Sequence, residues 1–582
     1  MATQILPSEI EQPNVKHQSP SILHGPVDPP LSDLTLGELL ELQCQHNGEA
    51  DCISIPWTGA RWSYDDLRRQ SSLIARALLA EGIGHGDRVA IMAGNCEQYA
   101  AIFFAVVRIG AILVILNNTY TPSEAMYGLE FTACKIFFTT KKIGRTNNEP
   151  LLAQVAAKDN GPKVVILRGD SEGYRSYEDM SLQGSKQDPA EMYNHEIKVS
   201  TYDVCNLQFT SGTTGNPKAA MLTHHNIVNN SRFIGDRMRL TTGDVLCCPP
   251  PLFHCFGLVL GLLAAITHGA KIVYPAEVFD GPATIRAIQE EQCTALHGVP
   301  AMFDTLLALP EAASLDASQL RLRTGIIAGA PVPRYLMEQL VSKLGMTEFT
   351  SSYGLTEASP TCFNAFTDDP IHTRLSTVGT LMPHAHAKIV DRDGKTLPVG
   401  ERGELLMGGY QLCAGYWNNS EKTAEVMTHD ENGMLWLHTG DEAVFNEQGY
   451  CSITGRFKDI IIRGGENIYP LEIEERLMAH PAISLAVVVG LKDEHYGEVV
   501  GAFLDGKPAA KAAESHLTKA EVRDWVTKRL GKHKAPAHVF WMGEGGVPAT
   551  VPLTGSGKVR KFELAKTGEE ILAKRVGKEA KL

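Results

Sequence analysis

The sequence predicts an α/β protein with a large N-terminal domain built on doubly wound, mainly parallel sheets. In this part, short apolar strands alternate with helical stretches, which is typical of a parallel sheet covered by helices on both faces. From about residue 375, short strands punctuated by glycine predict a small β-barrel-like subdomain. A small α+β unit follows residue 459. A chain of 582 residues is too long for one hydrophobic core, which agrees with several domains.

The first alternating unit can be justified element by element. Ser63 and Asp66 have the spacing of an N-cap and the third residue of a helix, and Gly82 is placed to end that helix. Residues 89–93, 97–107 and 111–116 then predict a strand, a helix and a strand, which together form a βαβ unit. Further short strands are expected at residues 135–140 and 164–167.

Composition excludes several classes of protein. The net charge of −13 argues against general binding to nucleic acids or anionic membranes, because both need a basic face. The longest apolar stretch, residues 100–116, is interrupted by Arg108 and Gly110 and does not predict a membrane span. The 12 cysteines show no C-x-x-C pair and are expected to be reduced, small apolar residues. The first residues lack the pattern of a secretory signal.

A loop rich in hydroxyl groups is the most informative motif. A strand is expected at residues 204–209 before it and a helix at residues 221–230 after it. Its glycines allow close approach of the backbone, its amides and hydroxyls donate hydrogen bonds, and its lysine adds a positive charge, so it can wrap a polyphosphate. It differs from a Walker A loop, and a Ser/Thr-rich surface turn is the alternative. The residues concerned are Thr210, Ser211, Gly212, Thr213, Thr214, Gly215 and Lys218.

Four more motifs follow in a fixed order. They are Tyr353-Gly354-Leu355-Thr356-Glu357, His438-Thr439-Gly440-Asp441, Gly455-Arg456-Phe457-Lys458-Asp459 continuing to Arg463-Gly464-Gly465-Glu466-Asn467-Ile468-Tyr469-Pro470, and Pro552-Leu553-Thr554-Gly555-Ser556-Gly557-Lys558. Each is weak alone: Glu357 suits a helix N-terminus, Asp441 suits a turn, and residues 555–557 suit a flexible linker. The five motifs in this order are specific.

With these motifs the chain resembles the adenylate-forming superfamily of acyl-CoA synthetases, nonribosomal adenylation domains and firefly-type luciferases, over roughly residues 35–570. The segments 225–230 and 251–256 resemble most the medium-chain acyl-CoA synthetase branch. The resemblance implies ATP, Mg2+ and CoA as reactants. It also implies a large AMP-binding domain over residues 31–455, a hinge at 456–459 and a mobile C-terminal lid domain over 460–582. The proline-rich residues 1–30 are expected to be a loose arm.

The resemblance also implies a role for each motif residue. For ATP, the loop from Thr210 to Lys218 would hold the β- and γ-phosphates, Glu357 would bind Mg2+, Tyr353 would stack on adenine, Thr356 would contact the α-phosphate, and Asp441 would bind the ribose hydroxyls with Arg456 close by. For the acid, Phe253 and His254 would border the carboxylate, Lys558 would bridge carboxylate and phosphate, and Gly329, Ala330 and Pro331 would form a wall shared by adenine and acyl group. Lys458 would be the hinge, and Gly464 and Gly465 would border the CoA tunnel. His254, among apolar neighbours, also suits an ordinary buried histidine.

The expected function is that of an ATP-dependent acid:CoA ligase that forms an acyl-adenylate, releases pyrophosphate and transfers the acyl group to CoA. The alternatives are a luciferase-type oxygenase and a stand-alone adenylation enzyme that acylates a carrier protein. The mixed residues near the expected acyl pocket permit a medium-chain fatty acid and equally a short hydroxy acid or another acid of secondary metabolism.

The last three residues, Ala580-Lys581-Leu582, resemble a peroxisomal address of the S-K-L type. Lys574, Arg575 and Lys578 make the preceding tail basic. We therefore expect a peroxisomal import receptor as a partner and a peroxisomal location, with the cytoplasm as the alternative.

Overall fold

The computed structural model describes residues 19–210, 217–313, 315–329, 332, 334–507, 516–553 and 559–579. Several predicted functional residues lie outside these ranges. They are Ser211, Gly212, Thr213, Thr214, Gly215, Ala330, Pro331, Lys558 and the tripeptide Ala580-Lys581-Leu582.

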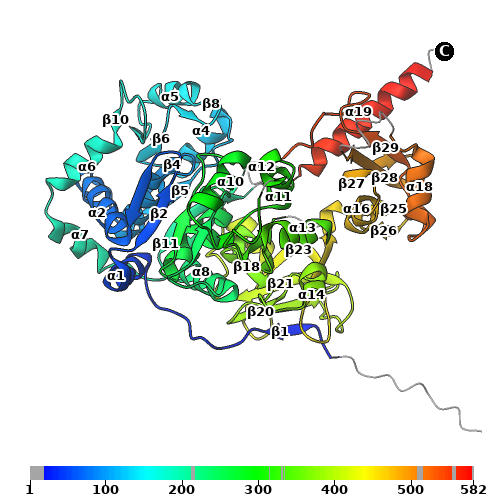
Figure 1. Ribbon diagram of the computed structural model, residues 1–582, viewed down its shortest axis with the longest axis horizontal. Helices are drawn as coiled ribbons and strands as arrows, with labels where there is room; N and C mark the ends of the chain where they lie inside the picture. Colours follow the sequence, from blue (N-terminus) through cyan, green and yellow to red (C-terminus); the bar gives the residue numbers. More distant parts are fainter. Residues whose placement is uncertain are drawn as a thin grey trace, which may run out of the picture.

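The first large sheet has seven strands in the order β10-β9-β6-β4-β5-β11-β12 (Figure 1). All neighbours in it are parallel except β11 and β12, which form an antiparallel pair. Its strands are β4 (Arg88–Met92), β5 (Ile112–Ile115), β6 (Ile136–Thr139), β9 (Lys163–Ile166), β10 (Arg175–Ser176), β11 (Val204–Thr210) and β12 (Lys218–Thr223). A two-stranded hairpin, β7 (Lys142–Ile143) and β8 (Thr146–Asn147), lies outside this sheet.

The second large sheet has nine strands in the order β19-β18-β17-β16-β15-β13-β14-β2-β3. Its centre, from β17 to β2, is parallel, and its edges are antiparallel. Its strands are β2 (Asp51–Ile55), β3 (Ala60–Ser63), β13 (Val245–Cys247), β14 (Lys271–Val273), β15 (Ala295–Leu296), β16 (Thr324–Ala328), β17 (Glu348–Gly354), β18 (Thr361–Asn364) and β19 (Thr380–Leu381).

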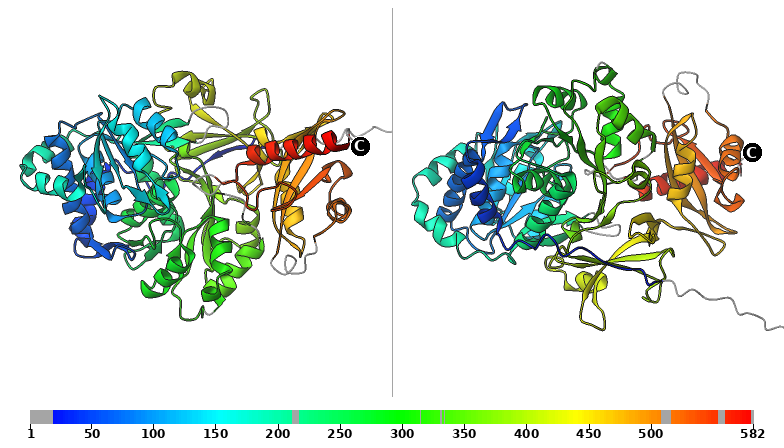
Figure 2. Two further views of the ribbon diagram at one scale, coloured as in Figure 1. Left: turned by 90° about the horizontal axis from the view of Figure 1, so that it is seen from above. Right: turned by 60° about the horizontal axis from the view of Figure 1, so that its bottom comes forward.

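Two smaller, mainly antiparallel sheets follow. One has the order β1-β20-β21-β23-β22, with β24 paired to β23, and it is the segment that the sequence predicted as barrel-like. The other has the order β26-β25-β28-β27, with β29 parallel to β28, and Figure 2 shows its unit, in orange and red, as a separate body at one end of the molecule. The strands are β1 (Ile22–His24), β20 (Ala385–Val390), β21 (Gly403–Gly409), β22 (Met427–His429), β23 (Leu435–Phe445), β24 (Cys451–Arg456), β25 (Ile461–Arg463), β26 (Glu466–Ile468), β27 (Ile483–Asp493), β28 (Gly497–Gly506) and β29 (His538–Trp541).

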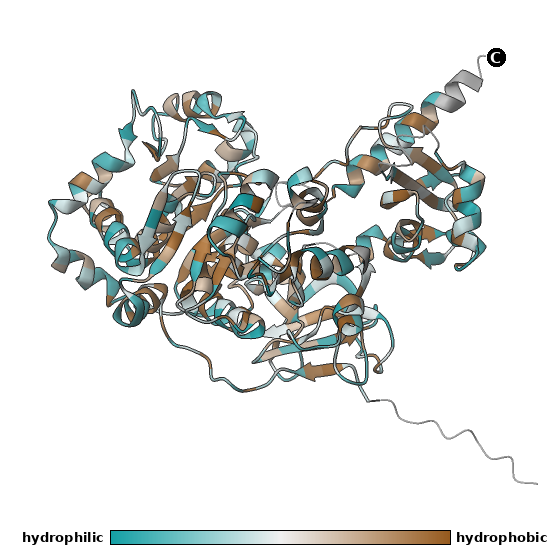
Figure 3. Cartoon of the chain, in the orientation of Figure 1, coloured by the Kyte–Doolittle hydropathy of each residue, from teal (hydrophilic) through white to brown (hydrophobic). Residues whose placement is uncertain are grey.

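Helices cover the sheets, and none of those described has the length and apolar character needed to cross a membrane. In Figure 3 the strands inside the molecule are mainly brown, and teal is frequent on the outer helices. The helices are α1 (Leu36–Asn47), α2 (Tyr64–Ala80), α3 (Glu97–Arg108), α4 (Pro122–Phe131), α5 (Glu149–Ala156), α6 (Tyr177–Ser185), α7 (Pro189–Glu196), α8 (His224–Met238), α9 (Ala264–Thr267), α10 (Gly281–Glu290), α11 (Pro300–Leu307), α12 (Pro310–Ala313), α13 (Arg334–Leu344), α14 (Ile371–Ser376), α15 (Ser420–Val426), α16 (Pro470–Met478), α18 (Lys519–Thr527), α19 (Lys561–Glu579), the π-helix η1 (Phe256–Leu263) and the 3-10 helices η2 (Thr356–Ala358), η3 (Phe457–Asp459) and η4 (Lys532–Lys534).

Helix α3 lies in the core between the two large sheets. It contacts β5 and β11 of the first sheet and β2 of the second, and every one of its residues is buried. Its buried Arg108 is neutralised by Glu41 at 2.6 Å and Glu196 at 2.6 Å, because a buried charge needs a partner. This helix therefore joins the two sheets into one continuous hydrophobic core.

The predicted βαβ unit is confirmed, including the capping box of α2, in which Ser63 accepts from the Asp66 N–H. The helix predicted at residues 221–230 is wrong at its start. Residues 218–223 form β12, because each of them pairs with a residue of β11, and α8 begins only at His224 behind the N-cap Thr223. The phosphate-loop motif therefore connects two antiparallel strands.

The described part of the expected loose arm is also different from the prediction. Residues 22–24 form β1, which pairs with residues 386–388 of β20. The backbone N–H of Ser21 also donates to the carbonyl of Leu397 at 2.8 Å. These backbone bonds hold the segment against the six-stranded sheet, which periodicity in so short a stretch could not reveal.

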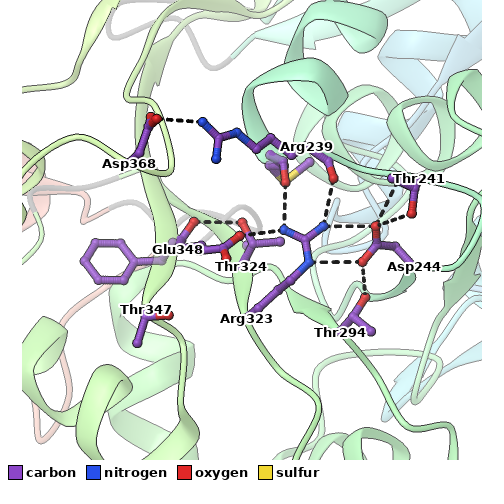
Figure 4. A network of polar contacts seen from close by, with 12 residues as sticks. Arg239, Thr241, Asp244, Thr294, Arg323, Thr324, Thr347, Glu348 and Asp368 are labelled. Atoms are coloured by element: carbon purple, nitrogen blue, oxygen red, sulfur yellow. Dashed lines mark hydrogen bonds and ion pairs between the residues drawn. The ribbon is translucent and has the colours of Figure 1, made fainter.

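A polar network around Arg323 ties together the amino ends of the central parallel strands (Figure 4). Its guanidinium bonds Glu348 at 2.7 Å and Asp244 at 2.9 Å, which stand at the starts of β17 and β13. It also donates to the last carbonyls around α8, those of Met238 at 3.2 Å and Arg239 at 2.8 Å. Cations at a helix C-terminus are stabilising because the carbonyls there carry partial negative charge.

We expect Arg323→Met to lower the free energy of unfolding by about 2–3 kcal/mol, because it leaves the buried Asp244 carboxylate without its cation. The measurement is urea unfolding of the full chain. The matched control is Arg69→Met, which breaks an exposed pair with Asp66 and should change the free energy by less than about 1 kcal/mol. Equal losses in the two variants would contradict a special role for Arg323.

Candidate active site

The candidate site lies where the central parallel strands end. The loop with Phe253 and His254 follows β13, Gly329 follows β16, and Tyr353 and Glu357 lie at and just beyond the end of β17. Carboxyl ends of parallel strands share one edge of a sheet, which is where open α/β sheets bind ligands. The parallel topology therefore gathers segments that are far apart in the sequence.

The ends of the phosphate-loop motif are fixed by strand pairing. Thr210 is the backbone partner of Lys218 across the β11–β12 pair, and its hydroxyl donates to the Lys218 carbonyl at 3.4 Å. The central loop residues, Ser211 to Gly215, lie outside the described residues. The ammonium nitrogen of Lys218 lies 5.0 Å from the ring centre of Tyr416.

The Asp441 carboxylate is the centre of a second group. It accepts from the Tyr353 hydroxyl at 2.6 Å and pairs with the Arg456 guanidinium at 2.7 Å. Asp441 and Arg456 are cross-strand partners on β23 and β24, so Asp441 belongs to a strand and is not the turn residue that its motif also suited. Burial, helped by the Asp441 charge, holds the pKa of Tyr353 well above its usual range, so the phenol stays a donor.

This arrangement can bind a diol such as the ribose hydroxyls. The Asp441 side chain is almost completely buried, and each carboxylate oxygen already has one donor from the protein. A carboxylate has about four acceptor positions, so both oxygens can accept a further hydrogen bond. Arg456 lies close to Asp441, as predicted, whereas the contact of Tyr353 with Asp441 was not predicted and the stacking of adenine on Tyr353 stays a prediction.

Glu357 is held by a residue that the motifs did not single out. The Tyr416 hydroxyl donates to Glu357 Oε1 at 2.7 Å, and the Cys413 N–H donates to the Glu357 carbonyl at 2.8 Å. Glu357 lies in η2, directly after Thr356. A single carboxylate such as that of Glu357 would fit Mg2+ if phosphate were bound there too, because Mg2+ is usually bound through one or two carboxylates, phosphate oxygens and water.

The loop after β13 is positioned by Asn95. Its amide accepts from the Leu252 N–H at 2.8 Å and donates to the Pro250 carbonyl at 3.4 Å. Within this loop the Phe256 N–H donates to Nδ1 of His254 at 3.1 Å, which orients the imidazole. The loop leads into the π-helix η1, a rare element that is frequent at functional sites.

Gly329, which was predicted to form part of a wall of the site, has little space for a side chain. Gly329 has a φ of +88°, and a Cβ at this position would lie 3.3 Å from a methyl group of Val299.

The hydrogen bonds of His297 fix its tautomer. His297 accepts from the Ile326 N–H at Nδ1 and contacts the Leu260 carbonyl through Nε2 at 2.9 Å, so Nε2 carries the proton. Burial lowers the pKa of His297 to about 4, which makes this histidine neutral.

The expected hinge and CoA-tunnel residues lie on the C-terminal side of β24. Lys458 is exposed in η3, the short turn that connects β24 to β25. Gly464 and Gly465 have φ values of +58° and +87° and form the two-residue turn of the hairpin β25–β26, as a type I′ turn requires. Gly464 donates to the Tyr496 carbonyl at 2.8 Å, within its own domain. This hydrogen bond holds Gly464 to its own domain and does not join it to Glu357 or Asp441.

Sequence reasoning missed Tyr416. Its partner Glu357 is 59 positions away, and no local pattern links the two. A tyrosine flanked by Gly415 and Trp417 after an irregular stretch was the only available signal.

Comparison with known proteins agrees with this architecture. The family model described as "AMP-binding enzyme" matches residues 40–417, and the model "AMP-binding enzyme C-terminal domain" matches residues 472–558. An acyl-CoA ligase named sidI from Beauveria bassiana is 72% identical over 554 residues, which cover 95% of this chain and 95% of that protein. The mitochondrial medium-chain acyl-CoA ligase ACSF2 of Danio rerio is 34% identical and covers 96% of this chain and 92% of its own length.

Among solved structures, ATP-bound MatB from Rhodopseudomonas palustris superposes with a TM-score of 0.79 at 26% identity, over 92% of this chain and all of that one. The predicted superfamily and fold class are thereby confirmed. From the two matching domain models and the relatives that span nearly its whole length, the chain belongs to the AMP-binding, adenylate-forming enzyme family.

Proposed function

We propose that this protein joins a carboxylic acid to CoA in two steps, with ATP as the activating substrate and Mg2+ as the metal. In the first step a carboxylate oxygen attacks the α-phosphorus of ATP, the bond to pyrophosphate breaks, and an acyl-adenylate forms. In the second step the CoA thiol attacks the acyl carbon and AMP leaves. The predicted class of ATP-dependent acid:CoA ligase is confirmed by the family and by its acyl-CoA ligase relatives.

The observation that supports this reaction best is the presence of two charged groups at and just beyond the end of β17. Asp441, Tyr353 and Arg456 form a buried group suited to the ribose, and Glu357 and Lys218 meet around Tyr416 next to the phosphate-loop motif. An attack of one anion on another needs neutralised charge and a fixed alignment. A magnesium ion at Glu357 would supply part of that neutralisation.

The surroundings of the acyl group favour an acid whose remaining part is uncharged. His297 is neutral, and its ring lies 5.6 Å from that of Phe256. Val299 and Gly329 contribute an apolar boundary close by. None of these four residues offers a cation to a second carboxylate, so a fatty or hydroxylated monocarboxylic acid fits them better than a dicarboxylic acid.

The direct test is acid-dependent release of pyrophosphate from ATP, followed by CoA-dependent release of AMP. We expect uncharged monocarboxylic acids in the panel to support both steps and dicarboxylic acids to be poorer substrates. Emission of light or consumption of oxygen in the absence of CoA would instead favour a luciferase-type oxygenase. Transfer to a carrier protein but not to CoA would favour a stand-alone adenylation enzyme.

The roles implied for the lid motifs generate a separate test. We expect Lys558→Ala to lower the rate of adenylation by about 100-fold, because it removes a donor to the developing negative charge. Thioester formation from supplied acyl-adenylate should change by less than about threefold, because Lys558 is assigned to the first step only. Single-turnover assays of each half-reaction measure both rates, and equal losses would contradict the assignment.

The hinge assignment can be tested with Lys458→Pro. The hydrogen bond that closes η3 runs from the Ile460 N–H to the Phe457 carbonyl and does not use the Lys458 amide. Proline fixes φ and should therefore restrict rotation of the C-terminal domain more than it damages this turn. We expect thioester formation to fall by more than tenfold while pyrophosphate exchange falls by less than threefold. A Lys458→Ala variant, which keeps φ free, should show neither loss.

A further inference from the structure

The segment that carries Tyr416 is laid along strand β12 like an additional strand. The Ala414 and Trp417 amides donate to the carbonyls of Met221 at 2.9 Å and Ala219 at 2.8 Å, and the Met221 amide donates to Gly415 at 2.9 Å. These backbone bonds place Tyr416 opposite Ala220, two residues beyond Lys218. The position of Tyr416 is therefore set by the same strand that ends the phosphate-loop motif.

The far side of the segment is fixed as well. The Tyr416 N–H donates to the Thr423 hydroxyl at 2.9 Å, and Thr423 belongs to α15. Gly415 has a φ of +112°, and an added Cβ would lie 2.8 Å from a methyl carbon of Thr423. The turn at Gly415 thus has room for glycine alone, and the tyrosine that follows it has little freedom of orientation.

From this position the phenol reaches the carboxylate that is assigned to the metal. Its hydroxyl lies 2.7 Å from Glu357 Oε1, a length typical of a strong hydrogen bond to a charged acceptor. Glu357 is thereby held through one oxygen, and the loop amide of Cys413 holds its backbone carbonyl.

The ring of the same side chain contacts the cation of the phosphate loop. The Lys218 ammonium nitrogen lies 5.0 Å from the ring centre, within the range of a cation–π interaction. Lys218 is half-buried, so this contact limits where its charge can lie. One tyrosine therefore sits between the carboxylate assigned to Mg2+ and the lysine assigned to the phosphates.

We propose that Tyr416 is a positioning residue for the magnesium–ATP complex. Its hydroxyl orients Glu357 for the metal, and its ring orients Lys218 for the β- and γ-phosphates. The proposal rests on the proposed function, because it concerns the first half-reaction of that function. In this proposal the hydroxyl contact with Glu357 affects metal binding, and the ring contact with Lys218 affects nucleotide binding.

The test compares Tyr416→Phe with Tyr416→Leu. Loss of the hydroxyl alone should raise the Mg2+ concentration for half-maximal adenylation by about tenfold, as is common when a partner of a metal ligand is removed. The KM for ATP at saturating Mg2+ should stay within about twofold, because the ring is still present. Tyr416→Leu should show the same metal effect and, in addition, a KM for ATP raised by about fivefold, as expected for a lost cation–π contact.

A readout independent of turnover is binding of Mn2+ in the presence of a non-hydrolysable ATP analogue, followed by electron paramagnetic resonance. Tyr416→Phe should weaken Mn2+ binding about tenfold. The matched control is Tyr410→Phe, which removes a buried hydroxyl that accepts from Asn230 in the same loop region but does not contact Glu357. It should leave Mn2+ binding unchanged.

A double mutant separates positioning from general damage to the fold. In a Glu357→Gln background, Tyr416→Phe should have no further effect on Mn2+ binding, because the group that it orients is gone. Unchanged metal dependence in Tyr416→Phe, or equal losses in Tyr410→Phe, would overturn the proposal. Wild-type protein that binds Mn2+ with the ATP analogue but releases no pyrophosphate with any acid would refute the proposed function without refuting this role.

Discussion

The structure depends on the buried carboxylate of Asp441, which is held between the phenol of Tyr353 and the guanidinium of Arg456. Tyr353 comes from the nine-stranded sheet, Asp441 from the six-stranded sheet, and Arg456 from the strand that leads into the expected hinge. A buried charge without partners is costly, so these three parts must keep their relative places. The interaction that suits the site to a nucleotide also joins the nine-stranded sheet to the six-stranded sheet.

The two ends of the central parallel strands carry different groups: a polar network lies at the amino ends, and residues of the candidate site lie at the carboxyl ends. At their amino ends, Arg323 binds carboxylates at the starts of β13 and β17 and the last carbonyls around α8 (Figure 4). At the carboxyl ends of the same strands, Gly329 follows β16, and Tyr353 and Glu357 lie at and just beyond the end of β17. The polar network at one end holds the strands together without using the residues of the candidate site at the other end. This division is common in α/β enzymes.

Sequence reasoning succeeded where the signal was local. The capping box of α2 and the βαβ unit around α3 were both readable from neighbouring residues. It failed at β12, because the strand state of residues 219–222 comes from pairing with β11 and not from their own pattern. It also missed Tyr416, whose contacts join positions far apart in the chain. Ordered motifs could name residue roles, but only the fold shows which side chains hold them.

The antiparallel β11–β12 pair determines what holds the two ends of the phosphate-loop motif. A phosphate loop that opens a helix inherits favourable charge from the helix terminus. Here two strands enclose the loop, and their pairing at Thr210 and Lys218 fixes its ends regardless of what lies between. The ends of the motif are therefore held by strand pairing and not by a helix terminus.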